Sequence, residues 1–189
     1  MSPDGGHKKR ILLVAPSYNF IYRGAMIKPG AIYSPHLGLA AVAGSLVSRG
    51  HLVRIVDLNK IEENAFLEEL RRFSPHYVGI SFSTILSREA LRLAKLVKDA
   101  DRNVIVVAGG VHPTSMPADV LASAAVDIVC LGEADYSIVD VVDGKPLEDI
   151  AGVAFRRNGE CILSRQREPI KDLDALAYPA WGLFNLREY

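Results

Sequence analysis

The sequence predicts an α/β fold in which a parallel β-sheet carries helices on both faces. Five short apolar runs, rich in β-branched residues, alternate with segments of helical pattern. Continuous apolar runs of this length are typical of parallel strands that are buried on both faces. Two of the runs end in Gly-containing corners, and crossovers between parallel strands are almost always right-handed. We therefore expect a doubly wound, Rossmann-like sheet of five parallel strands in the flavodoxin-like order 2-1-3-4-5.

Helix signals separate the expected strands. Ser34 or Pro35 opens the first helix, and Gly50 follows its end, which is the usual asymmetry of Pro and Gly. Ser87 is expected to cap a later helix. The strands are expected at 11–15, 52–57, 77–82, 103–108 and 126–131, and the other helices at 64–72, from 87 onward, at 117–124 and at 136–142.

Small residues crowd the first helix, among them Gly38 and Gly44. Because Gly lowers helix stability, a close neighbour is expected to require them. Tight packing on the sheet and space for a ligand beneath the helix are both open interpretations.

The ends of the chain differ in style from the middle. Residues 1–9 are expected to form a disordered leader, and 10–145 the main domain. The dipeptide Asn158-Gly159 is a strong hairpin signal, so 146–189 is expected to hold a C-terminal β-hairpin and an extended tail that leads toward a further domain. The aromatic loop 17–34 is long enough to be functional.

Composition describes an ordinary folded domain. Of 189 residues 49% are hydrophobic and 23% charged, and the 22 basic residues balance the 22 acidic ones. No charge excess points to nucleic acid or to a membrane surface. Neither a transmembrane run nor a hydrophobic signal region is recognisable. The two cysteines, Cys130 and Cys161, are expected to be reduced thiols in a cytoplasmic protein.

Several common chemistries do not fit the residues. The first strand is followed by Pro16-Ser17-Tyr18, without a G-x-G-x-x-G or Walker pattern, so dinucleotide and P-loop sites are excluded. Ser81 and His112 are expected on neighbouring strand ends, but no nucleophile elbow accompanies them, which argues against a hydrolase. No histidine pair has zinc-ligand spacing.

The carboxyl edge of the expected sheet is apolar and has few residues suited to acid–base catalysis. Gly109 and Gly110 end the fourth expected strand and let a bulky ligand lie against bare main chain. Ligands of open parallel sheets bind outside the carboxyl ends of the strands. Such an edge suits a large, flat, mostly neutral organic ligand. The alternative is that the glycines only turn the chain.

An ordered set of short motifs crosses this edge and its surroundings. They are Ser34-Pro35-His36-Leu37-Gly38-Leu39-Ala40, Arg49-Gly50-His51-x-Val53-x-x-x-Asp57, Val78-Gly79-Ile80-Ser81-x-Ser83-Thr84, Gly109-Gly110-Val111-His112-Pro113-Thr114, Gly132-Glu133, Ile150-Ala151-Gly152-Val153-Ala154-Phe155-Arg156 and Leu173-Asp174-x-Leu176-x-x-Pro179-Ala180. The set resembles the amino-terminal cobalamin-binding domain of the cobalamin-dependent radical SAM enzymes. That group includes the anaerobic magnesium-protoporphyrin monomethyl ester cyclases and many methyltransferases.

The resemblance implies a corrinoid on the strand ends. It implies that the nucleotide tail of the cofactor runs past hydroxyls of the third strand and glycines of the fourth. The implied cofactor-binding residues are Leu37, Gly38, Ser81, Ser83, Thr84, Gly109, Gly110, Val111, His112, Pro113, Gly132 and Glu133.

Two departures from the family pattern qualify this implication. The D-x-H-x-x-G motif that supplies a cobalt ligand in the wider fold is absent after the first strand. The chain also lacks the C-x-x-x-C-x-x-C motif for an iron–sulfur cluster. The resemblance therefore implies a cobalamin-binding module whose 4Fe-4S cluster and S-adenosylmethionine belong to a radical SAM domain outside this sequence, and we expect no catalysis by the module alone.

Two alternatives stay open. One is a cofactor-free structural or substrate-docking domain of the same family, in which the aromatic loop 17–34 fills the ring site. The other is an enzyme or nucleotide binder of the flavodoxin or glycosyltransferase type, in which the turn Arg49-Gly50-His51 also occurs.

Overall fold

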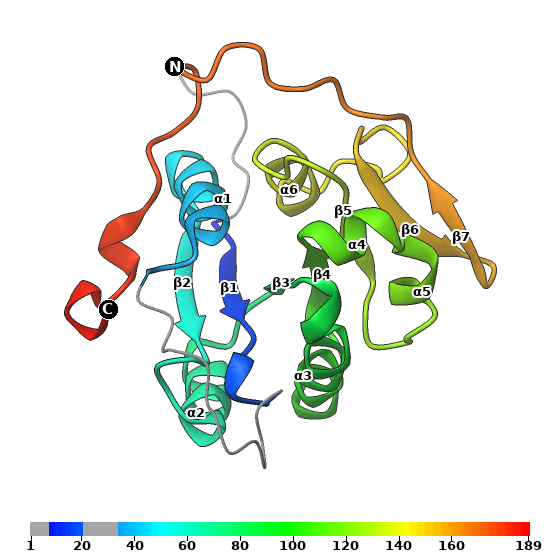
Figure 1. Ribbon diagram of the computed structural model, residues 1–189. Helices are drawn as coiled ribbons and strands as arrows, with labels where there is room; N and C mark the ends of the chain where they lie inside the picture. The colour runs from blue at the N-terminus through cyan, green and yellow to red at the C-terminus, as the bar shows by residue number, and fades with distance from the viewer. Residues whose placement is uncertain (1–7, 21–33) are drawn as a thin grey trace.

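The computed structural model describes residues 8–20 and 34–189 and shows one central sheet (Figure 1). The expected leader at 1–9 and the aromatic loop 17–34 lie largely outside the described residues. The strands of the sheet are β1 (Arg10–Ala15), β2 (Leu52–Asp57), β3 (Tyr77–Ser81), β4 (Ile105–Gly109), β5 (Ile128–Cys130), β6 (Val153–Arg157) and β7 (Glu160–Leu163).

The strand order is β2-β1-β3-β4-β5-β6-β7. The first five strands are parallel and follow the predicted order 2-1-3-4-5. The prediction of a five-stranded sheet is wrong, because the C-terminal hairpin extends the sheet to seven strands. β6 pairs antiparallel with β5 from Ile128 to Cys130, and so occupies an edge whose backbone groups would otherwise lack partners.

Burial explains why the hairpin joins the sheet. Val153 and Ala154 on β6 are fully buried, one toward each face, and Phe155 is 4% exposed. The hairpin turns at Asn158 and Gly159, which both have positive φ angles, as the sequence predicts. The strand β6 thus supplies residues to the apolar cores on both faces of the sheet.

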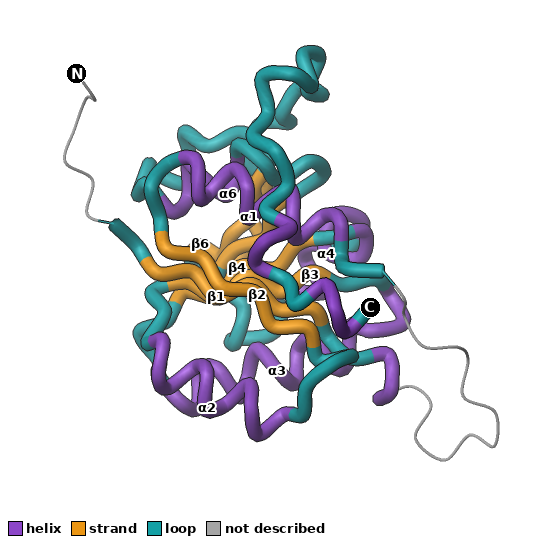
Figure 2. Tube along the Cα trace, turned by 90° about the vertical axis from the view of Figure 1, so that its left-hand side faces the viewer, coloured by secondary structure: helices purple, strands orange, loops and turns teal. Residues whose placement is uncertain are grey.

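Helices cover both faces of the sheet (Figure 2). α2 and α3 lie on one face, while α1 and α6 lie on the other, and each face has its own apolar core. The helices are α1 (Leu37–Ser48), α2 (Glu63–Phe73), α3 (Ser87–Ala100), α4 (Val111–Ser115), α5 (Pro117–Leu121) and α6 (Ser137–Val142), with short 3-10 turns at Tyr18–Phe20, Thr84–Leu86, Trp181–Leu183 and Leu186–Glu188. In the residues that the model describes, no helix is long and apolar enough to cross a membrane.

Two helix starts differ from the sequence prediction. α1 begins after His36, whose Nδ1 accepts a hydrogen bond from the backbone N–H of Leu39 and so replaces a Ser or Pro start. α3 has Leu86 as its N-cap rather than Ser87, because the 3-10 turn at Thr84–Leu86 runs directly into the helix. Both starts lie beside the carboxyl edge of the sheet, where the turns follow the strand ends.

Residues 164–189, which we call the C-terminal strap, run back across the molecule. In Figure 1 the strap leaves β7, passes above α6 and ends beside β2. The N–H of Ala180 donates to the carbonyl of Ala40 on α1 at 2.8 Å. A Cβ on Gly44 would lie 2.2 Å from the carbonyl oxygen of Tyr178. Gly44 is therefore required by the close approach of the strap, a neighbour that neither interpretation of the small residues anticipated.

Candidate functional site

Two cavities open at the carboxyl edge of the parallel strands. Cavity A, of about 260 Å³, lies between α1, α6 and the sheet, and its walls are mostly apolar. Cavity B, of about 510 Å³, lies beyond the ends of β1, β2 and β3. His36, Ser81 and Gly110 line both cavities, so the two spaces meet at the end of β3.

Most of the predicted site residues lie along these cavities. Cavity A is lined by Gly38, Ser81, Gly109, Gly110, Gly132 and Glu133. Cavity B is lined by Ser81, Ser83, Gly110 and Val111. Four predicted residues line neither cavity, namely Leu37, Thr84, His112 and Pro113. The residues from β3, β4 and the β5 end are thus brought together, while the flanking predictions lie outside the walls.

The Gly109-Gly110 corner combines the two roles that the sequence left open. Gly110 has a φ of +99°, and a Cβ there would lie 2.7 Å from the carbonyl oxygen of Phe82, so it is needed to turn the chain against β3. A Cβ on Gly109 would meet no heavy atom of the described residues within 4 Å, apart from its chain neighbours. Gly109 therefore presents bare backbone to cavity A.

A hydroxyl without a partner marks cavity B. Ser83 Oγ is buried and makes no hydrogen bond to any described residue. A buried polar atom without a partner costs free energy, so such an atom in a cavity wall indicates a missing donor or acceptor. Ser81 Oγ lies 3.4 Å from His36 Nε2 and faces both cavities. The hydroxyls of the β3 end thus supply polar contacts inside otherwise apolar walls.

His36 is a site residue that the sequence analysis did not single out. Its Nδ1 accepts from the N–H of Leu39, so in the neutral tautomer the proton sits on Nε2, which faces Ser81 Oγ. Burial lowers the pKa of His36, although the Asp57 carboxylate acts in the opposite direction. A neutral imidazole with both nitrogens engaged joins α1 to β3 and leaves no lone pair for a metal. The sequence names His36 only as a member of the motif that begins at Ser34, and the structure shows it as the N-cap of α1.

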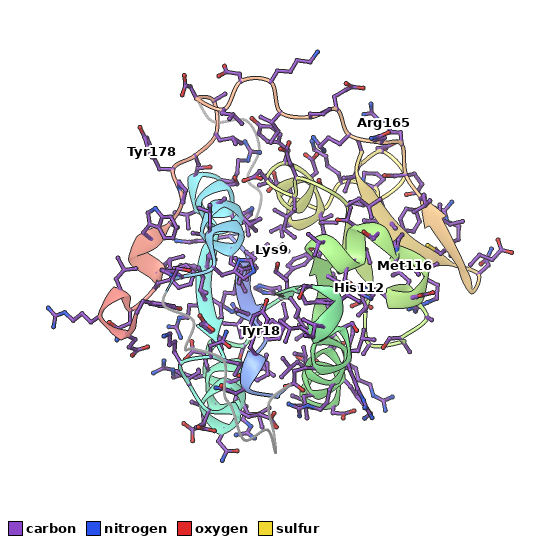
Figure 3. All side chains as sticks on the ribbon, viewed as in Figure 1. Lys9, Tyr18, His112, Met116, Arg165 and Tyr178 are labelled. Carbon is purple, nitrogen blue, oxygen red and sulfur yellow. The ribbon has the colours of Figure 1, made fainter. Side chains whose placement is uncertain are left out.

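His112 is turned away from these cavities. Its Nδ1 lies 3.2 Å from Thr84 Oγ1, and its ring packs at 5.8 Å from the ring of Phe82. Figure 3 shows His112 on the α4 side of the edge and Tyr18 on the β1 side. Thr84 and His112 therefore form a pair that steadies the rim beside the cavity walls.

Acidic and amide groups at the β2 end are a second set that the sequence analysis missed. Asp57 and Asn59 line cavity B together with Tyr18. Asp57 is only 9% exposed, and its Oδ1 accepts from both the backbone and the side-chain N–H groups of Asn59. The available signal is an Asp that ends a strand two residues before an Asn, a common turn pattern.

The far wall of cavity A holds two further polar groups. Glu133 Oε2 accepts from the N–H of Ile170 at 3.0 Å, which ties the strap to this edge. Burial raises the pKa of the Cys130 thiol to about 12, so the thiol in this wall stays neutral. Within residues 8–20 and 34–189, no group of three or more His, Cys, Asp or Glu side chains is arranged to hold a metal ion. The cavity walls that the structure describes can therefore enclose an organic ligand.

Comparison with known proteins agrees with this geometry. The model of the B12 binding domain matches residues 24–142, which is more than half of the chain. The chain belongs to the B12-binding domain family. B12 is cobalamin, a large corrin ring with a nucleotide tail. The matched span contains β2 to β5 and the walls of both cavities, apart from the wall residues of β1 and of the segment after it.

Two relatives extend the likeness over nearly the whole chain. An uncharacterised methyltransferase of Pyrococcus horikoshii is 29% identical over 187 residues, which cover 95% of this chain and 40% of that protein. An anaerobic magnesium-protoporphyrin IX monomethyl ester cyclase of Synechocystis is 28% identical over 189 residues, covering 95% of this chain and 37% of that protein. The chain thus spans less than half the length of these relatives.

A solved structure shares the fold. The radical S-adenosylmethionine methyltransferase TsrM from Kitasatospora setae, determined with cobalamin and a [4Fe-4S] cluster bound, superposes with a TM-score of 0.67. The match covers 84% of this chain and 31% of that chain at 16% sequence identity. At this identity the likeness confirms the architecture of the B12-binding fold.

Proposed function

We propose that this chain is the cobalamin-binding module of a cobalamin-dependent radical SAM protein. The proposal is carried by the buried, unpartnered Ser83 Oγ in the wall of cavity B together with the bare backbone of Gly109 in the wall of cavity A. Both features lie at the strand ends of a member of the B12-binding domain family. A hydroxyl that awaits a partner and a backbone open to a bulky group fit a cofactor that is mostly apolar with a polar tail.

The two cavities suggest how the chain divides the work of binding. Cavity A, with Gly38 and Gly109 in its walls, would take the nucleotide tail beneath α1. Ser81, which faces both cavities, would bind a polar group where the tail leaves the ring. Cavity B, with Ser83 and Val111, would border the entrance. Leu37 is 61% exposed and Val111 67% exposed, so both offer apolar surface to a ring outside the cavities.

The cofactor would bind without a protein histidine on cobalt. His36 uses both ring nitrogens within the protein, and His112 lies against Thr84 outside the cavity walls. When bound, the cobalt would supply methyl-transfer or radical chemistry in the intact protein. The residues of this chain would bind and orient the corrinoid and exclude water from its tail.

The remaining parts of the reaction would belong to a radical SAM domain of the same polypeptide. The sequence has two cysteines, Cys130 and Cys161, and they lack the C-x-x-x-C-x-x-C spacing of a cluster-binding motif. The relatives include a cyclase and methyltransferases, which support either radical cyclisation or methyl transfer as the reaction class. Two free thiols support a cytoplasmic location.

A binding experiment tests the proposal. The purified chain is mixed with hydroxocobalamin and passed over a gel-filtration column, and a retained corrin spectrum is the expected result. Ser81→Leu places an apolar side chain between the cavities and is expected to weaken binding about tenfold or more, since it blocks the slot and removes a hydrogen bond. Ser48→Leu on the exposed end of α1 is the matched control.

The outcomes are distinct. A colourless protein at high hydroxocobalamin concentration would contradict the proposal and would favour a cofactor-free docking domain. Binding that is equally strong in wild type and Ser81→Leu would contradict the placement of the tail at the β3 end.

A further inference from the structure

The C-terminal strap is attached at both rims of the candidate site. Near its start, the N–H of Ile170 donates to Glu133, which lines cavity A. At its end, the hydroxyl of Tyr189 donates to Asp57 Oδ2 at 2.5 Å, and Asp57 lines cavity B. Figure 1 shows the strap passing above α6, running down beside α1 and reaching β2. The strap therefore contacts two residues of the cavity walls.

The Tyr189 side chain is held firmly in this position. Lys60 Nζ lies 4.4 Å from the centre of its ring, and the ring of Phe184 packs edge-on at 6.1 Å. Phe184 is itself only 8% exposed and belongs to the core between α1 and the sheet. Burial and the adjacent Asp57 raise the pKa of Tyr189, so the phenol keeps its proton and acts as a donor.

A chain of hydrogen bonds leads from Tyr189 into the wall of cavity B. Asp57 accepts from Tyr189 on Oδ2 and from Asn59 on Oδ1, at 2.9 Å from the backbone nitrogen and 2.7 Å from Nδ2. Asn59 Oδ1 in turn accepts from the N–H of Tyr18 at 2.8 Å. Asp57, Asn59 and Tyr18 all line cavity B. The backbone at Tyr18 is thus held by Asn59, and Asn59 is held by Asp57, which accepts the hydrogen bond from the strap.

We propose that Tyr189 is a positioning residue for cavity B, and that docking of the strap and binding of the corrinoid favour one another. The inference rests on the proposed function, in which cavity B borders the entrance of the corrinoid site. With Tyr189 docked, the Asp57 carboxylate is fixed at both oxygens. Without the Tyr189 hydroxyl, one oxygen of the nearly buried Asp57 carboxylate loses its donor, and the carboxylate rotates to hydrogen-bond with water. The hydrogen bonds from Asn59 to Asp57 and from Tyr18 to Asn59 then weaken, because they belong to the same network.

The first experiment measures the wall without any ligand. Backbone amide hydrogen exchange is followed at Tyr18 and Asn59 in wild type and in Tyr189→Phe. The variant is expected to exchange about three- to tenfold faster at these amides, since it loses one hydrogen bond of a linked set. Tyr178→Phe is the matched control, because it removes the same hydroxyl from the same strap at a side chain that is 94% exposed. Unchanged exchange in Tyr189→Phe would overturn the proposal.

The second experiment measures the coupling to the cofactor. Hydroxocobalamin affinity is expected to fall about three- to tenfold in Tyr189→Phe and to stay at the wild-type value in Tyr178→Phe. Asp57→Asn tests the next link, and the loss in the double variant is expected to be smaller than the product of the two single losses. A Tyr189→Phe affinity equal to that of wild type, or independent effects of the two substitutions, would contradict the coupling.

Failure of the proposed function looks different. If wild type retains no corrinoid, the cofactor assignment and its coupling are wrong, while faster exchange at Tyr18 and Asn59 in Tyr189→Phe would still support the positioning of the wall by the strap. Far-ultraviolet circular dichroism spectra and urea midpoints of the variants are measured to check that each variant is folded. A loss of affinity in a folded variant is then caused by the altered wall of cavity B and not by unfolding.

Discussion

Gly44→Ala is expected to destabilise the protein, although the same change in an open helix stabilises it. Gly44 lies inside α1, where replacing Gly by Ala normally raises stability by about 1 kcal/mol. Here the new Cβ would lie 2.2 Å from the carbonyl oxygen and 3.1 Å from the carbonyl carbon of Tyr178. Both atoms are backbone, so no flexible side-chain end can move aside.

Whether Gly44→Ala raises or lowers stability depends on the size of the steric cost relative to the gain in helix propensity. An ordinary carbon–oxygen contact is about 3.4 Å or longer, so the strap would have to move by about 1 Å. That shift also strains the 2.8 Å hydrogen bond from Ala180 to Ala40, which contributes about 0.5–1.5 kcal/mol. Overpacking typically costs about 1–3 kcal/mol. The sum exceeds the helix gain, and a net loss of about 1 kcal/mol is expected.

Urea unfolding of Gly44→Ala and Gly38→Ala measures this difference. Gly38 is on the same helix, and among the described residues a Cβ there would approach the His36 ring at an ordinary 3.4 Å. Gly38→Ala is therefore expected to unfold at a urea concentration equal to or above that of wild type. If Gly44→Ala is stabilised as much as Gly38→Ala, the close approach of the strap to α1 is wrong.

Two further predictions concern the site. Gly110→Ala is expected to cost about 1–3 kcal/mol of stability, because the position has a positive φ and the new Cβ would contact the Phe82 backbone. Thermal unfolding should show a smaller loss for the control Gly132→Ala, where φ is also positive but no described atom lies within 4 Å of the new Cβ. Equal losses in the two variants would refute the steric argument. Burial lowers the pKa of His36 below 6.5, so as the pH falls the unfolded chain binds a proton at this histidine before the folded chain does. The stability that neutral His36 contributes is therefore fully present above pH 6.5 and is lost as the pH falls through the folded pKa. The difference between the urea midpoints at about pH 7.5 and about pH 5.5 should therefore be smaller in His36→Asn, which keeps a capping oxygen, than in wild type. Part of the pH dependence should persist in the variant, because the pKa of His76 is also lowered. A pH dependence identical to that of wild type would contradict this role of His36.

The sequence by itself determined the parallel sheet, its strand order and the sheet edge at which the two cavities open. These features have local signals. The run Ile11 to Ala15 is apolar without interruption, Asn158-Gly159 strongly favours a tight hairpin, and Gly109-Gly110 marks a strand end. Each pattern lies within a few residues, so backbone preferences and burial decide it before any distant contact forms.

Only the tertiary structure decided how the pieces join. The hairpin became part of the sheet because the open edge of β5 and the apolar residues of β6 cover one another. His36 entered the site through a side chain 45 positions away in the sequence, at Ser81. Tyr189 and Asp57 are 132 positions apart, and no periodicity connects them. Such contacts arise because a folded chain places distant polar groups where water is excluded, and a single local pattern carries no record of the partner.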